Sequence, residues 1–81
     1  MSDIKVMFTN KYGESRHYAI WDEGRDPNQP PVVFDGYLDS GQATDWLDLH
    51  GEGSYGRVKY QRSDGAATTT DVTDGNNVDM D

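Results

Sequence analysis

Residues 4–9 read Ile4-Lys5-Val6-Met7-Phe8-Thr9, and a bulky apolar side chain from Ile4, Val6 or Phe8 falls on every second position. A period of two is typical of a β-strand that turns one face to a core and the other to water. No window of about eleven residues in the chain shows the 3.6-residue period of an amphipathic helix. The sequence therefore predicts an all-β protein.

The same alternation, interrupted by turn residues, continues through the rest of the chain. It predicts strands over residues 14–22, 32–38, 43–49, 57–62 and 66–72, and a short last strand over 77–80. Turn-forming residues cluster at 10–13, 39–42, 50–56, 63–65 and 74–76, and a polar loop with three prolines spans 23–31. Gly36 predicts a bulge inside its strand, or else a tight hairpin turn at Asp35-Gly36.

Six to seven short antiparallel strands separated by turns predict one small β-sandwich of the Greek-key or immunoglobulin-like kind. A small β-barrel is the alternative. We expect a single domain over residues 1–81, with residues 79–81 frayed. This length excludes large catalytic scaffolds such as TIM barrels, which need about 250 residues.

Composition alone is close to that of a disordered chain. Leu, Ile, Val and Phe together make up 13 of the 81 residues, and the net charge is -8. Nine aromatic residues offset this shortage only if several Tyr and Trp side chains join the core. The chain has no cysteine and no apolar run long enough to cross a membrane, and its first residues do not resemble a signal peptide. These features slightly favour the cytoplasm and leave the localisation otherwise unknown.

The charge is unevenly distributed along the sequence. Residues 26–56 contain six acidic side chains and no Lys or Arg, and residues 63–81 contain five with none. The only dense basic segment lies between them, at residues 57–62. Phosphate groups are bound by clustered basic side chains, so we expect neither nucleic acid nor an anionic membrane as a partner. An acidic surface instead attracts a protein with a basic surface.

Two patterns suggest chemistry but lack the residues that would complete it. Residues 51–58 match G-x-G-x-x-G-x-V, and in this they resemble the Gly-rich loop of protein kinases. The other kinase motifs are missing, and residues 57–62 predict a strand where a dinucleotide site needs a helix. His17 and His50 stand in no metal-ligand spacing. We therefore predict no enzymatic activity, no catalytic residue, no metal site and no cofactor.

Aromatic side chains give the best indication of a binding surface. In the strand predicted over residues 43–49, two leucines take the core face, which leaves Trp46 exposed with Thr44 and Asp48. An exposed Trp beside a carboxylate can anchor a protein or stack on a sugar ring. Burial of the tryptophans in the core is the competing interpretation. The predicted binding residues are Trp46, Asp48, Tyr55 and Trp21.

The sequence thus predicts a non-enzymatic acidic binding module that recognises a protein partner through exposed aromatic residues, as an inhibitor, accessory domain or assembly component. One alternative is a carbohydrate-binding module that stacks sugars on Trp46 and Trp21. Another is an exported domain stabilised by calcium at Asp74, Asn76 and Asp79, because Ca²⁺ prefers oxygen ligands. A mimic of DNA is the last alternative, and the basic segment argues against it.

Overall fold

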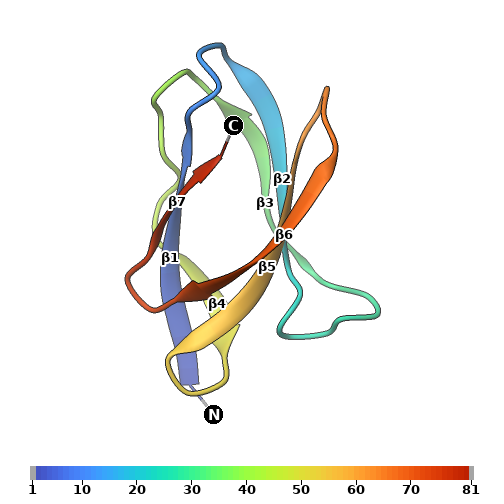
Figure 1. The fold of residues 1–81 in the computed structure, drawn as a ribbon, viewed down its shortest axis with the longest axis vertical. Coiled ribbons are helices and arrows are strands. Elements are labelled where there is room, and N and C mark those ends of the chain that lie inside the picture. Colours follow the sequence, from blue (N-terminus) through green and yellow to red (C-terminus); the bar gives the residue numbers. More distant parts are fainter. Residues whose placement is uncertain (1, 81) are drawn as a thin grey trace.

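A computed structural model describes residues 2–80, which form seven strands in two sheets and no helix (Figure 1). The strands are β1 (Ser2–Asn10), β2 (Arg16–Asp22), β3 (Val32–Leu38), β4 (Leu47–Gly51), β5 (Tyr55–Arg62), β6 (Ala67–Thr73) and β7 (Asn77–Met80). One sheet has the order β4-β1-β7, and the other has the order β3-β2-β5-β6. The predicted all-β sandwich is confirmed.

The connections between the sheets explain the strand order. β2–β3 and β5–β6 pair as antiparallel neighbours, and β4 lies between these pairs in the sequence but belongs to the other sheet. The chain therefore returns β5 to the side of β2, as in a Greek key. The expectation that all strands pair antiparallel is wrong, because β7 runs parallel to β1. The alternation of apolar and polar residues does not show whether a strand runs parallel or antiparallel to its neighbour. The sequence therefore could not predict the parallel pairing of β1 and β7.

Each of the seven strands contributes to the core, which compensates for the shortage of aliphatic residues. The buried core consists of Ile4, Val6, Phe8, Tyr18, Ile20, Leu38, Leu49, Val58, Val72 and Met80. These residues fall on alternate positions of their strands, as predicted. Tyr18 is the aromatic residue that joins Phe8 there, and neither tryptophan is in this buried set.

The strand predicted over residues 43–49 is shorter than expected, because β4 begins only at Leu47. Regular strand pairing is interrupted at Thr44, whose side chain bonds to the backbone of β1. The backbone N of Thr44 donates to Phe8 O at 2.8 Å, and its Oγ1 accepts from Phe8 N at 3.1 Å. Thr44 is consequently buried, so the prediction that it shares an exposed face with Trp46 is wrong. A side-chain oxygen here replaces the backbone acceptor that a continuing strand would supply.

Two further expectations are corrected. Gly36 is neither a bulge nor a turn, because it pairs in register with Tyr18. The register shift lies instead between Ile20 and Trp21, where β3 carries one residue more than β2. Residues 79–81 were expected to fray, yet Asp79 and Met80 belong to β7 and Met80 is fully buried. Asp81 lies outside the described residues.

Asn10 was predicted in a turn and is instead the fully buried last residue of β1. Its Nδ2 donates to Glu14 O and to Leu38 O, both at 2.9 Å. Its Oδ1 accepts from Tyr12 N and from the Tyr18 hydroxyl, both at 2.8 Å. Leu38 and Tyr18 belong to the other sheet, so this amide joins the two layers.

Asp22 makes a second buried connection from β2 to the three-stranded sheet. Its Oδ2 accepts from His50 N in β4 at 2.8 Å and from Arg25 Nε at 3.2 Å. Its Oδ1 accepts from Arg25 N at 3.2 Å. None of the buried side-chain nitrogen and oxygen atoms that the structure describes lacks a partner, which agrees with the high penalty for burying a polar group alone.

The Asn10 amide gives a first prediction. Asn10→Ala removes four hydrogen bonds and leaves buried groups unpaired, so we expect the free energy of unfolding to fall by about 3 kcal/mol. Tyr18→Phe removes the bond from the hydroxyl to Asn10 and keeps the other three bonds of the amide, and we expect a loss of about 1 kcal/mol. Urea unfolding followed by tryptophan fluorescence measures both values. Equal losses for the two variants would contradict a central role for the amide.

Gly56 gives a second prediction, which concerns close packing between the sheets. A Cβ on Gly56 would lie 2.6 Å from His50 O and 3.2 Å from Ile4 Cδ1. Gly56→Ala must therefore displace backbone, and we expect a loss of about 2–3 kcal/mol. Gly36→Ala is the matched control, because its Cβ would meet only the Phe34 ring at 3.5 Å. Thermal unfolding that lowers the Tm of both variants equally would contradict this account.

Candidate functional site

The four predicted binding residues do not form one site, because they fall on opposite faces of the sandwich. In the three-stranded sheet, Leu49 and Leu47 pack inward, so Asp48 points outward. Trp46 immediately precedes β4, two positions before Asp48. In the four-stranded sheet, Trp21 and Tyr55 occupy the outward positions of β2 and β5. Packed sheets are separated by about 10 Å, so one sugar chain cannot stack flat on both tryptophans.

The first candidate surface is the outer side of the three-stranded sheet, called here the acidic face. It is defined by Asp3, Lys5, Asp48, Asp74, Asp79 and the neighbouring Trp46. All of these side chains are exposed. Lys5 is the one basic residue of the set, and the carboxylates of Asp3, Asp48 and Asp74 lie near it. This part of the surface therefore carries a negative charge.

Lys5 is neutralised within this set. Its ammonium group forms an ion pair with Asp48, and its backbone N donates to Asp74 Oδ1 at 2.9 Å. The hydrogen bond and the charge of Asp48 hold the pKa of Lys5 above its ordinary value, and the nearby charges of Asp3 and Asp74 add to this. Lys5 thus stays protonated beside Asp48. Asp3 Oδ1 lies 3.6 Å from Arg25 Nη2, an ion pair with a basic residue outside this set.

Trp46 projects from the segment that enters β4, and 48% of its surface is exposed. The sequence left open whether Trp46 is exposed or belongs to the core, and the face it would share with Thr44 does not exist, because Thr44 is buried. The indole is left outside because the residues on both sides are fixed. Thr44 bonds to the backbone of Phe8, and Leu47 packs against the core. A large aromatic group held by ordered neighbours loses little conformational entropy on binding.

The second candidate surface is the outer side of the four-stranded sheet, called here the aromatic face. It is defined by Trp21, Val32, Tyr37 and Tyr55 with the polar groups between them. Of the four large apolar side chains that are exposed among the described residues, three lie here: Val32, Tyr37 and Tyr55. Trp21, half-buried, pairs with Val32 on one side and Lys59 on the other.

Neighbouring side chains orient the rings of the aromatic face. Lys59 Nζ lies 5.1 Å from the centre of the Trp21 ring, a cation–π contact. The His17 ring meets Tyr37 edge to face at 5.3 Å, and His17 Nε2 lies 2.5 Å from Asp35 Oδ1. Tyr37 is 72% exposed, yet it was not among the predicted binding residues. The alternation with buried Leu38 was the signal that could have found it.

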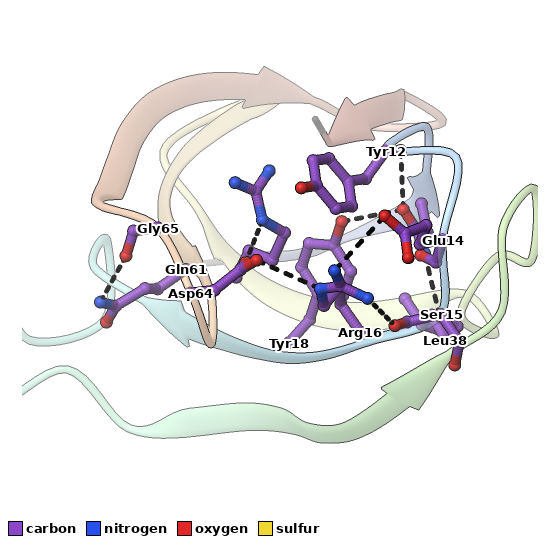
Figure 2. Close-up of polar contacts among 11 residues, drawn as sticks. Tyr12, Glu14, Ser15, Arg16, Tyr18, Leu38, Gln61, Asp64 and Gly65 are labelled. Atoms are coloured by element: carbon purple, nitrogen blue, oxygen red, sulfur yellow. Dashed lines mark hydrogen bonds and ion pairs between the residues drawn. The ribbon is translucent and has the colours of Figure 1, made fainter.

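A cluster of two arginines and a tyrosine closes one end of the sandwich (Figure 2). Arg62 Cζ lies 3.8 Å and Arg16 Cζ lies 5.1 Å from the centre of the Tyr12 ring. The Asp64 carboxylate accepts hydrogen bonds from both guanidinium groups. Its Oδ2 accepts from Arg16 Nε at 3.2 Å, and its Oδ1 accepts from Arg62 Nε. The cluster joins the turn before β2 to the β5–β6 hairpin, and because Asp64 and Glu14 balance its charge, it is a structural tie rather than an anion site.

The remaining candidate groups are dispersed. His17 pairs with Asp35 on the aromatic face, whereas His50 Nε2 lies 3.3 Å from Glu52 Oε1 in the other sheet. Within the described part of the chain, no three His, Cys, Asp or Glu side chains are grouped as metal ligands. At the proposed calcium turn, Asn76 Oδ1 accepts from Thr73 N at 3.4 Å. The calcium hypothesis stays an untested prediction.

Comparisons of this chain with protein-family models, with curated proteins and with solved structures found no match. Within residues 2–80 there is also no helix of the length and apolarity needed to span a membrane.

The arginine cluster gives a third prediction, on the effect of pH. The hydrogen bond from Arg62, with a further one from Arg16, holds the pKa of Asp64 below its ordinary value. A carboxyl group with a lowered pKa stabilises the fold above its unfolded pKa of about 3.9 and loses this effect as the pH falls. The Tm difference between wild type and Asp64→Asn should therefore be largest near neutral pH and shrink below about pH 4.

Asp45→Asn is the control for this experiment, because it removes an equal charge at an exposed position before β4, away from the arginine cluster. Differential scanning calorimetry across the pH range measures both variants against wild type. A difference for Asp64→Asn that stays constant from neutral to acidic pH would rule out the ion pair as its cause.

Proposed function

We propose that this protein is a non-enzymatic acidic binding module that recognises a protein partner with a basic surface through its acidic face. Trp46 is the observation that carries the proposal. It is a half-exposed indole two positions before the outward-pointing Asp48, and the chain on either side is fixed by the bonds of Thr44 to Phe8 and by the packing of Leu47 on the core. A module of this kind acts as an inhibitor, an accessory domain or a component of an assembly.

Charge supports a basic partner. The net charge of the chain is -8, and the only Lys of the acidic face is already paired with Asp48. Asp3 is in turn paired with Arg25 at 3.6 Å, so the negative potential on this side comes mainly from Asp74 and Asp79. Such a potential speeds encounter with a positively charged surface and repels phosphate backbones.

Trp46 supports a specific contact rather than attraction alone. Tryptophan is enriched among the few residues that dominate the binding energy of protein interfaces. Charged groups around such an anchor set the orientation and the association rate more than the affinity. The proposed division of roles is therefore that Trp46 anchors the partner while Asp48 and the other carboxylates steer it.

The test of this proposal is a fourth prediction. A partner is captured on the immobilised protein, purified, and its affinity for variants is measured by biolayer interferometry. We expect Trp46→Ala to weaken binding by about 30-fold or more, as for an interface anchor of at least 2 kcal/mol. Asp48→Lys should mainly slow association, and added salt should reduce the association rate of the wild type.

Tyr37→Ser is the control, since it removes a still more exposed aromatic group from the opposite face. Circular dichroism and the Tm must first show that each variant is folded. A partner that loses affinity with Tyr37→Ser and keeps it with Trp46→Ala would overturn the proposed site. Binding that does not depend on salt would overturn the electrostatic part of the proposal.

A further inference from the structure

The aromatic face differs from the rest of the molecule in its charge balance. Its outward strand positions carry two acidic and two basic side chains, which are Asp35, Asp71, Arg57 and Lys59. The net charge of the whole chain is -8. This face is therefore close to neutral, while the excess of acid lies elsewhere, part of it on the opposite side at the acidic face.

On the aromatic face, an acidic and a basic side chain lie on opposite sides of an apolar centre. Asp35 is on β3, and Lys59 is on β5, with Trp21 and Ala19 of β2 between these strands. A surface with both signs arranged about an apolar centre is complementary to a second copy of itself. Symmetric dimers use such self-complementary patches, in which each copy contributes the same residues.

We propose that the aromatic face is the contact surface of a homodimer, in which a second copy of this chain packs its own four-stranded sheet face to face against it. A two-fold axis parallel to β2 would lay Trp21 against the same residue of the other copy. It would also place β3 of one copy over β5 of the other. Asp35 of one copy would then lie opposite β5 of the other copy, two residues along the strand from Lys59.

Electrostatics favours this face over the acidic face for self-association. Each copy carries a charge of -8, so two copies repel unless their acidic groups are kept apart. Stacking four sheets at about 10 Å spacing places the two acidic faces about 30 Å from each other. This distance exceeds the Debye length of about 8 Å at physiological salt, so the repulsion between them is largely screened.

The size of the face sets the expected strength. With the axis over β2, β6 of each copy has no strand opposite, so three strands about 4.8 Å apart and seven residues long overlap over a flat area of about 14 by 24 Å. Stable complexes bury about 800 Å² on each partner. The aromatic face is smaller than this, so the dimer is weak, concentration-dependent and formed reversibly. It would leave both acidic faces free and would make the module bivalent.

The test is sedimentation equilibrium of the full chain from about 10 µM to about 1 mM, at about 0.02 M and 0.5 M NaCl. We expect a monomer–dimer equilibrium that tightens with added salt, because salt screens the repulsion between two acidic chains. This is the opposite of the salt dependence expected for a basic partner. The two proposals rest on different faces and can therefore fail separately.

Charge reversals provide a matched pair of variants. Asp35 and Asp48 are both exposed, and each has 61% of its side chain accessible. Asp35→Lys and Asp48→Lys make the net charge less negative by the same amount. If net charge alone controlled dimerisation, both variants would dimerise more tightly, because the two copies would repel each other less. We expect Asp35→Lys to weaken the dimer about tenfold because it makes the aromatic face basic, while Asp48→Lys leaves it unchanged or tighter.

Tyr37→Ser and Trp46→Ser form a second matched pair without any change of charge. We expect Tyr37→Ser to weaken the dimer about tenfold and Trp46→Ser to leave the dissociation constant within about twofold. The proposal is overturned by a wild type that stays monomeric at every concentration, by a dimer that weakens with salt, or by equal effects within either pair. If Tyr37→Ser does not fold, the charge-reversal pair decides the question.

Discussion

The buried side chain of Asn10 is the interaction on which the arrangement of the two sheets depends. An asparagine amide can donate two hydrogen bonds and accept two, and all four are made here. They reach the turn after β1 and the strands β2 and β3 of the opposite sheet. Any sliding of one sheet over the other would leave these buried groups unpaired, so the amide selects one alignment of the layers.

Asp22 makes the corresponding connection at the other end of β2, where its carboxylate accepts the backbone N–H of His50. Between these two polar ties lies the apolar core, to which every strand gives at least one side chain. An 81-residue chain with few aliphatic residues buries only a limited apolar area. Specific buried hydrogen bonds therefore have a large share in deciding which of several compact packings is the native one.

Fixing the two sheets in this way also fixes which surfaces face apart. The strand β1 turns its apolar residues inward and its charged residues to one side of the sandwich, while β2 turns Trp21 and His17 to the other side. A net charge of -8 is thereby separated into an acidic face with one exposed tryptophan and a nearly neutral face with several aromatic rings. The two sides are suited to different kinds of contact.

The sequence by itself determined the all-β class, the positions of most strands and the inward residues, because a period of two follows directly from the geometry of a strand. It also indicated the two acidic stretches, while it left open whether Trp46 is exposed or buried. The parallel pairing of β1 and β7, the burial of Thr44 and Asn10, and the separation of Trp46 from Trp21 were decided only by the tertiary structure. Each of these depends on contacts between residues far apart in the chain. A local pattern specifies which face a side chain takes, but not which strand lies opposite or which buried polar group it meets.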